Sequence, residues 1–409
     1  MQYVLFEDAL SNRFLPLTYT RPVYSLRIGV DLIREKWARL LQQPVVGLAH
    51  TPLLQDTDRP NLNEDTVFLN GRYLPDTYLV GRLLKDLQFN QGFYHPPDEL
   101  IAFRTSSAWL ETVGADFIDV GKLPLNLSLF EVPDYRRLRK LTQLTDLFTL
   151  NGDQLRLDVP DLASRQPSQP LTDPHTVVYA PENVFVADGV QVRAAILNAE
   201  DGPIYLGPGA QVMEGAMIHG AHAIGAGSTV QMGARLRGDT TLGPGCKVGG
   251  EVSNTVFQGY SNKSHDGFLG NSLIGEWCNL GAGSTCSNLK NNYSTVRLYS
   301  HLSEKYEDTG LLFCGLTMGD FSRAGIQTLF NTGTVVGVCC NLYGAELPPK
   351  FVPSFSWGQG ERLETYRLEA AFKTIDRMMA RRDRHLEPAL RQLLQTLFDQ
   401  TERFRYWEY

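Results

Sequence analysis

The 409-residue sequence lacks the usual marks of membrane, secreted and zinc-binding proteins. No apolar run approaches the ~20 residues that a membrane-spanning helix needs. The first residues, MQYVLFED, contain acids and no basic segment, so no signal peptide is expected there. The six cysteines form no CxxC pair, and we expect small buried thiols in a reducing cytoplasm. The net charge of −7 argues against nucleic acid or a membrane surface as a partner.

A six-residue period of aliphatic side chains is the strongest positive signal in the chain. Its members are Leu206, Val212, Ile218, Ile224, Val230, Leu236, Leu242 and Val248. Glycine follows at Gly207, Gly225 and Gly243, where sharp corners are expected. A period of six fits neither an α-helix nor a simple amphipathic strand, and it indicates a parallel β-helix with three hexads in each coil.

The period continues beyond residue 248 with two interruptions. It returns in a short form at Ile274 and Leu280. It then resumes at Met318, Ala324, Phe330, Val336 and Leu342. The register breaks near 250–270 and near 287–315, where we expect loops to leave the coil and to carry function.

The rest of the chain divides into recognisable parts. The apolar runs 3–6, 44–48 and 66–70 predict buried strands, and helical spacing predicts an amphipathic helix over 29–41. This alternation suggests a parallel α/β domain, and 134–149 also looks helical. The predicted domains are an α/β domain at 1–155, a proline-rich linker at 156–176, a β-helix at 177–356 and a helical tail at 357–409.

The tail contains the basic run Arg381-Arg382-Asp383-Arg384. Such a run is interpreted as a solvated helix face rather than a ligand site. We expect the tail helices to pack on the end of the solenoid.

The segment 261–292 carries the residues most suited to chemistry. His265, Asn279 and Asn288 lie at the first interruption and on the coils just after it. A neutral imidazole can take a proton from an attacking amine or hydroxyl, and asparagine amides can hold sugar hydroxyls. The alternative is structural, with the histidine bonding a loop carbonyl and the asparagines stabilising turns.

Two strings in this segment, SHDGFLGNSLIG and CNLGAGSTCSNLKN, carry a family resemblance. They resemble the acetyltransferase half of the bifunctional N-acetylglucosamine-1-phosphate uridyltransferase / glucosamine-1-phosphate N-acetyltransferase family. The resemblance implies a left-handed β-helix that uses acetyl-CoA, with His265 as the general base. It implies sugar binding by Asn279 and Asn288, and a backbone contact from Ala282 to acetyl-CoA. The segment 234–249 resembles the family where Arg237 would bind phosphate, which suits a planar guanidinium.

The sequence departs from this family at three positions. Phe268 stands in place of a substrate-binding tyrosine and lacks its hydroxyl. Ser253 replaces a phosphate-binding lysine, and Ile326 replaces a serine near acetyl-CoA. These changes leave the acceptor sugar open.

The N-terminal string FEDALSNRFLPLTYTRP resembles the phosphate loop of sugar nucleotidyltransferases without its glycines. Val23 stands where that family has a lysine, and Arg72 replaces the aspartate that binds the metal. Since arginine cannot ligate Mg²⁺, a magnesium requirement is left open. Arg13, Arg21 and Arg72 are a candidate anion site, and the alternative is surface arginines on a degenerate domain.

Three functions follow from these observations. The first is a cytoplasmic, homotrimeric transferase of UDP-N-acetylglucosamine and cell-envelope metabolism, with a nucleotidyltransferase-like domain of altered or lost activity. The second is a non-catalytic sensor or scaffold that binds a sugar nucleotide. The third, a zinc enzyme that uses His219 and His222, is disfavoured because the spacing to further histidines does not match.

Overall fold

The computed structural model describes residues 1–51, 54, 61, 64–113, 117–132 and 134–408. The chain divides into two compact units, which are described separately. Unit 1 comprises residues 1–14, 20–26 and 31–144. Unit 2 comprises residues 15–19, 27–30 and 145–409.

Unit 1 is built on a mixed six-stranded sheet rather than on a purely parallel one. Its strand order is β4 (Val45–Leu48), β1 (Gln2–Phe6), β5 (Asp65–Asn70), β8 (Glu99–Ser106), β7 (Gln91–His95) and β9 (Ser128–Glu131). The three strands predicted from the sequence, β1, β4 and β5, are parallel. The pairs β5–β8 and β7–β8 are antiparallel and β7–β9 is parallel, so the prediction of a parallel sheet holds for three of the five strand pairs.

Two helical predictions in the N-terminal half need correction. Helix α1 (Ile33–Leu41) confirms the amphipathic helix but starts later than residue 29, because the residues before it form the paired short strands β2 (Arg27–Ile28) and β3 (Asp31–Leu32). The predicted helix at 134–149 is instead a 3₁₀ turn, a short strand β10 (Arg139–Lys140) and one turn of helix, α4 (Asp146–Thr149).

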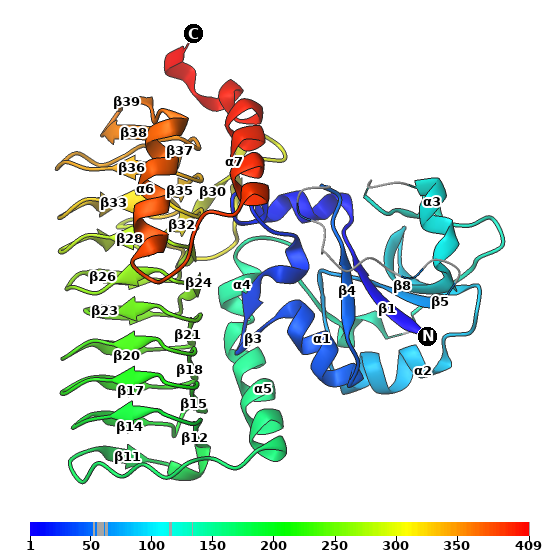
Figure 1. Cartoon of the computed structure of the whole chain (residues 1–409), viewed down its shortest axis with the longest axis horizontal. Coiled ribbons are helices and arrows are strands. Elements are labelled where there is room, and N and C mark those ends of the chain that lie inside the picture. The colour runs from blue at the N-terminus through cyan, green and yellow to red at the C-terminus, as the bar shows by residue number, and fades with distance from the viewer. Residues whose placement is uncertain (52–53, 55–60, 62–63, 114–116, 133, 409) are drawn as a thin grey trace. The chain divides into compact units, whose positions relative to one another are not determined.

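Unit 2 is a parallel β-helix with three faces, of the predicted left-handed class (Figure 1). The first sheet contains β11 (Val177–Tyr179), β14 (Ile196–Asn198), β17 (Met217–His219), β20 (Arg235–Arg237), β23 (Glu251–Ser253) and β26 (Phe268–Gly270). The second contains β12 (Val184–Val186), β15 (Ile204–Leu206), β18 (His222–Ile224), β21 (Thr240–Leu242), β24 (Val256–Gly259), β27 (Leu273–Glu276), β32 (Thr317–Met318), β35 (Val335–Val336) and β37 (Phe351–Val352).

The third sheet carries the candidate site. It contains β13 (Gln191–Val192), β16 (Gln211–Val212), β19 (Thr229–Val230), β22 (Lys247–Val248), β25 (Asn262–Lys263), β28 (Asn279–Leu280), β33 (Arg323–Ala324), β36 (Asn341–Leu342), β38 (Ser356–Gln359) and β39 (Arg362–Thr365). A short pair, β29 (Thr285–Cys286) and β34 (Leu329–Phe330), lies outside these sheets.

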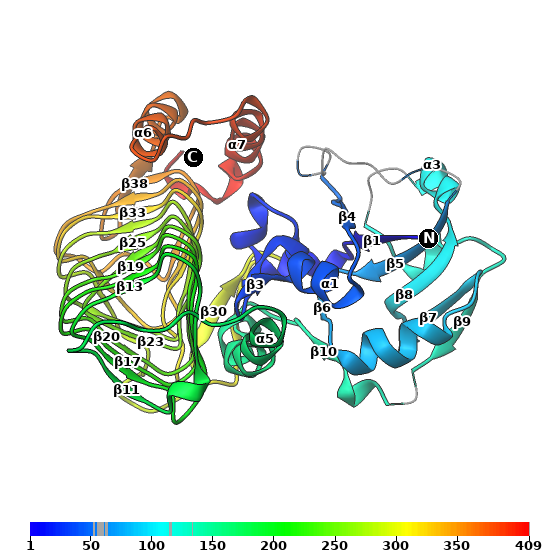
Figure 2. The same cartoon turned by 60° about the horizontal axis from the view of Figure 1, so that its bottom comes forward.

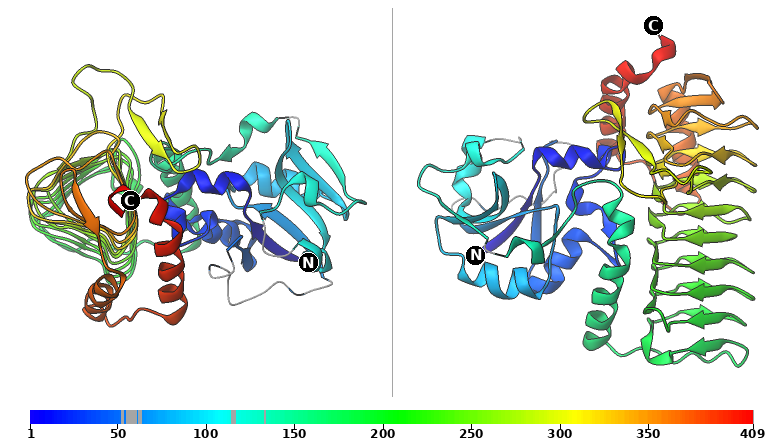
Figure 3. Two further views of the ribbon diagram at one scale, coloured as in Figure 1. Left: turned by 90° about the horizontal axis from the view of Figure 1, so that it is seen from above. Right: turned by 180° about the vertical axis from the view of Figure 1, so that it is seen from behind.

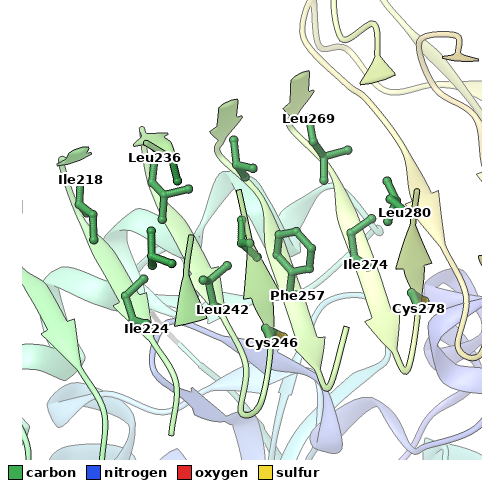
Figure 4. Close-up of a cluster of buried hydrophobic side chains, with 14 of the residues drawn as sticks. Ile218, Ile224, Leu236, Leu242, Cys246, Phe257, Leu269, Ile274, Cys278 and Leu280 are labelled. Carbon is green, nitrogen blue, oxygen red and sulfur yellow. The ribbon is translucent and has the colours of Figure 1, made fainter. Parts of the chain in front are cut away.

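The six-residue period is confirmed as the inner lining of the coils. All eight members between Leu206 and Val248 belong to one buried cluster, together with the later members Met318 to Leu342. Figure 4 shows part of this lining, in which Leu236 follows Ile218 and Leu242 follows Ile224 on the neighbouring coil. The six cysteines are all buried and free, as expected.

The two register breaks have different structural causes. At the first, no loop leaves the coil: Arg235 pairs with Glu251 and Lys247 with Asn262, so coils shorten from 18 residues to 16 or fewer. At the second, a hairpin of β30 (Arg297–Ser300) and β31 (Lys305–Asp308) leaves the solenoid between β29 and β32 (Figure 3). The prediction of a loop was therefore wrong near 250–270 and right near 287–315.

The predicted linker at 156–176 is helical in its first part. Helix α5 (Asn151–Arg165) contains Pro160 and crosses the predicted boundary at 155/156. Its apolar side packs Leu155 and Val159 against Phe185 and Ala223 of the second sheet. The extended part of the segment starts only at Gln166.

The C-terminal tail contains two helices, α6 (Leu368–Ala380) and α7 (Pro388–Gln400), as expected. The solenoid continues through β38 and β39, past the predicted boundary at 356. The helices pack along a corner of several coils rather than only on the end, because Phe372 and Ile375 share one cluster with Trp277, Phe321 and Phe355. Figure 2 shows α6 beside this corner. None of the described helices is both long and apolar enough to cross a bilayer.

Candidate functional site

His265 lies at the corner between β25 and β26, just after the shortest coil, in which Lys247 pairs with Asn262. The corner Ser264–Gly267 is fixed by backbone bonds to both neighbouring coils: Glu251 N donates to Gly267 O (3.3 Å) and Gly283 N donates to Asp266 O (3.1 Å). Lys263, which is 1% exposed and points into the solenoid, donates from Nζ to the His265 carbonyl oxygen. The backbone of the corner is therefore held from inside, while the imidazole of His265 is exposed.

A column of polar side chains crosses the outer face of the third sheet beside this corner. The register places Lys247, Asn262, Asn279 and Arg323 opposite one another on successive strands. Strands in such a stack lie about 4.8 Å apart, so these four side chains form a continuous polar surface. Asn279 is the member that the sequence predicted.

A cavity of about 690 Å³ lies over this column and is closed on one side by α6. Three of the predicted site residues line it: His265, Asn279 and Ala282. Within the described part of the chain, no acceptor is recorded for the backbone N–H of Ala282, which leaves this donor available to a ligand. Ile326, one of the departures from the family, is 72% exposed and also lines the cavity.

The other three predicted residues do not line this cavity. Arg237 lies on β20 of the first sheet, where its guanidinium contacts Glu251 Oε1 at 2.9 and 3.1 Å. Phe268 begins β26 on the same sheet, and the Asn288 amide donates to Asn271 Oδ1 at 2.9 Å. The predicted residues are thus dispersed: Arg237 and Phe268 lie on the first sheet and Asn279 on the third, while Asn288 follows β29 outside both sheets.

Sequence reasoning missed the cationic wall of the cavity. Arg377 on α6 and Arg381 and Arg382 after it line the cavity, although the basic run was interpreted as a solvated face. Arg382 donates to Gly245 O (2.6 Å) and to Asn262 Oδ1 (3.1 Å), which attaches the end of α6 to the third sheet. The signal that could have found this wall is the recurrence of arginine at 377 and 381, one helical turn apart.

The candidate anion site in unit 1 is contradicted at Arg72. Its guanidinium is 0% exposed and donates to both Asp8 oxygens (2.8 and 2.6 Å), to Glu99 Oε1 (2.6 Å) and to Leu141 O (2.7 Å). Burial alone would raise the pKa of Glu99, but Arg72 and Lys140 lower it below its usual value. Arg72 is therefore a structural ion pair, while Arg13 is exposed and Arg21 half-buried.

The same ion pairs bear on magnesium. The carboxylates of Asp8 and Glu99 are engaged by Arg72, and Glu99 also by Lys140. Among the described residues, no group of three or more acidic, histidine or cysteine side chains is arranged to hold a metal ion. In this arrangement Asp8 and Glu99 are therefore paired with cations rather than facing an open site.

In the segment that resembles the phosphate loop, a side chain of the protein itself occupies a backbone amide. The buried carboxylate of Glu7 accepts from Val23 N (2.8 Å) and contacts His50 Nδ1 (2.9 Å). A buried carboxylate bound to the amide of Val23 opposes the binding of a triphosphate at that amide, because like charges repel.

His219 and His222 point in opposite directions from neighbouring strands. His222 is 0% exposed inside the solenoid, and burial lowers its pKa to about 4. His219 is exposed and contacts Asp201 Oδ2 at 2.9 Å. The two imidazoles therefore do not converge on one metal.

The fold and the cavity define a class of protein in which a nucleotidyltransferase-like region precedes a left-handed β-helix. Residues 3–166 match the family described as sugar nucleotidyl transferase. The bifunctional protein GlmU of Methanocaldococcus jannaschii is 32% identical over 90 residues, which cover 22% of this chain. The chain spans about a fifth, 21%, of the length of that curated relative. These matches agree with the family resemblance found in the sequence.

Two solved structures align with about half of the chain at low similarity. An Arabidopsis UDP-N-acetylglucosamine acyltransferase has a TM-score of 0.31 and 13% identity, covering 50% of this chain and 77% of that one. The polySia-specific acetyltransferase NeuO has a TM-score of 0.26 and 12% identity, covering 49% of this chain and 86% of that one.

Proposed function

We propose that this chain is a transferase of amino-sugar nucleotide metabolism that N-acetylates an amino-sugar phosphate with acetyl-CoA at the His265 corner. The observation that carries the proposal is the cavity in which His265, Asn279 and Ala282 meet. An exposed imidazole on a rigid corner suits a general base, since its backbone cannot shift when the ring accepts a proton.

The reaction balances with these residues. The sugar amine attacks the thioester carbonyl carbon, so that a C–N bond forms and the C–S bond breaks. His265 takes the proton from the amine and returns it to the leaving sulfur, which departs as the thiol of coenzyme A. The Ala282 N–H, which has no recorded acceptor among the described residues, would donate to the thioester oxygen as it gains charge.

The first experiment measures acetyl-CoA turnover by the purified protein with a panel of amino-sugar phosphates, glucosamine-1-phosphate among them. Replacing His265 by alanine should lower kcat by about 10²–10⁴-fold, the usual contribution of a general base. His219→Ala is the matched control, because His219 is an exposed histidine of the same solenoid outside the cavity. Absence of turnover with every acceptor, or an unchanged rate for His265→Ala, would refute the proposal.

For the N-terminal region we propose altered or lost nucleotidyl transfer. Two contacts support this: the guanidinium of Arg72 is bonded to Asp8, and the carboxylate of Glu7 accepts a hydrogen bond from Val23 N. Incubation with a sugar-1-phosphate, UTP and Mg²⁺ should release no pyrophosphate. Release that depends on Mg²⁺ would contradict this part of the proposal.

The alternative is a non-catalytic sensor that binds a sugar nucleotide. The contacts of Arg72 with Asp8 and of Glu7 with Val23 favour it over an enzyme that catalyses both nucleotidyl and acetyl transfer. It predicts an increase in the melting temperature with UDP-, dTDP- or CMP-sugars without product formation. The homotrimer is likewise a proposal, tested by light scattering, which should give three times the 45.8 kDa of one chain.

A further inference from the structure

The cavity has a second wall that the proposed acetyl transfer does not explain. Lys247 and Arg323 project from the third sheet, and Arg377, Arg381 and Arg382 come from α6 and the residues after it. These five cations line one cavity, and no aspartate or glutamate lines it with them. The concentration of positive charge stands out in a chain whose net charge is −7.

Three of these cations have no recorded counter-charge. In the ranges that the structure describes, no ion pair or hydrogen bond of the side chain is recorded for Lys247, Arg377 or Arg381. The nearest acid on α6, Asp376, pairs with Arg391 at 3.0 Å, so it does not neutralise the wall.

Arg323 and Arg382 are held in place by other contacts. Arg323 is half-buried and reaches Met378 Sδ across the cavity. Arg382 is fixed by Gly245 O and Asn262 Oδ1. Arg323 and Arg382 are thus held in position before any ligand binds. Arg377 and Arg381, which line the same cavity, are exposed.

A purely structural role accounts for only part of this arrangement. Arginines in the last turn of a helix interact favourably with its dipole, which would justify Arg377. The dipole of α6 gives no reason for Lys247 and Arg323 to face the same space from β-strands. Cations that converge without an anion repel one another, a cost that is recovered when an anion binds between them.

We propose that this wall, the side chains of Lys247, Arg323, Arg377, Arg381 and Arg382, binds the diphosphate of a nucleotide-bearing ligand. The planar guanidinium groups can each make paired hydrogen bonds with phosphate oxygens. The C-terminal helical segment, rather than the six-residue repeats alone, then supplies most of the phosphate-binding charge. That this ligand is the acyl donor rests on the proposed function, because the same cavity contains His265.

A diphosphate could come from coenzyme A or from a sugar nucleotide. Isothermal titration of the full chain with coenzyme A, UDP-N-acetylglucosamine and ADP separates these sources, and ADP serves as the minimal diphosphate probe. The double variant Arg377→Gln/Arg381→Gln should weaken binding of the relevant ligand by about tenfold or more, since each charged hydrogen bond contributes roughly that factor. Raising the salt concentration should weaken wild-type binding more than variant binding.

The matched control is Lys373→Gln. Lys373 is an exposed cation on the same helix, one turn before Arg377, and it does not line the cavity. Its removal changes the net charge in the same direction and should leave affinity within about twofold, as expected for a screened surface charge. Circular dichroism of each variant checks that α6 stays folded.

The outcomes separate this inference from the proposed function. Tighter binding of coenzyme A or of the UDP-sugar by wild type than by the double variant supports the diphosphate site and names its source, even if no acceptor is acetylated. Equal affinities of wild type and double variant overturn it, even if acetyl transfer occurs. A failure of all three ligands to bind the wild type overturns it as well.

Discussion

Lys263 is a charged side chain in an aliphatic column. The register places it after Val230 and Val248 on the inner side of the third sheet, where it is 1% exposed. Its ammonium reaches the carbonyl of His265, and burial lowers its pKa to about 8. We infer that the lysine holds the His265 corner at the cost of burying a charge.

The pH dependence of stability tests this role of Lys263. In the unfolded chain the lysine keeps a pKa near 10.5, so between about pH 8 and 10.5 the unfolded state binds more protons than the folded state. The unfolding free energy of wild type, measured relative to Lys263→Met, should therefore rise across this window, by on the order of 3 kcal/mol. Urea unfolding at several pH values checks it, and a constant difference would show that the ammonium is not buried.

The sequence predicted site residues best where they lie close together along the chain within one motif. His265, Asn279 and Ala282 were predicted from neighbouring strings, and the structure brings them into one cavity. Arg72 was misjudged because its partners Asp8 and Glu99 are far from it in sequence. Burial and ion pairing over such separations depend on the tertiary fold, which a motif does not contain.

At the scale of elements, the corner Ser264–Gly267 is the feature that places His265. Gly267 has φ of +124°, and a Cβ there would overlap the backbone oxygen of Ser284 on the next coil. Gly267→Ala should lower the melting temperature strongly and abolish turnover, because both the backbone angle and the overlap disfavour the corner.

Gly209→Ala is the control for this substitution. Gly209 also has a positive φ, +67°, but a Cβ there would meet no atom within 4 Å. It should cost only about 1 kcal/mol, the penalty of the backbone angle alone. Equal losses in differential scanning calorimetry for the two variants would show that contact between coils does not define the corner.

The elements could be predicted from sequence as far as their periodicity was unbroken. The coils from Leu206 to Val248 follow from the six-residue period, whose members all lie inside. The shortened coil from Arg235 to Glu251 was predicted as a loop that leaves the solenoid. A loss of register in the sequence shows that the repeat length changes, but it does not distinguish a deletion of residues from an insertion. Pro160 also misled the prediction, since α5 continues through it.

At the scale of the whole molecule, the helical tail supplies part of the lining of the cavity on the solenoid. Residues 357–409 showed only amphipathic helices, and the sequence offered no means of docking them on particular coils. In the structure Phe372 and Ile375 pack against Trp277 and Phe355, which brings the arginines of α6 to the cavity. The candidate site is therefore a product of the solenoid and the tail together.

The acid stability of the folded chain offers a test at this scale. His222 inside the solenoid and His301 on the hairpin are both buried, and burial lowers their pKa values to about 4 and about 3. Below pH 6.5 the unfolded chain protonates these side chains while the folded chain does not, so stability should fall as the pH decreases from about 6.5 to 4. Each histidine should contribute about 1.4 kcal/mol per pH unit in that window.

Two substitutions separate this effect from the protonation of carboxylates. His222→Gln keeps a donor for Gly220 O, and His301→Phe suits the surrounding rings of Tyr299, Phe351 and Phe404. Each should reduce the dependence of the melting temperature on pH between 6.5 and 4, and the double variant should show the sum, because the two sites share no recorded partner in the described residues. His385→Gln, at an exposed histidine, should leave the profile unchanged. Identical profiles for wild type and double variant would mean that both buried histidines gain their protons without unfolding.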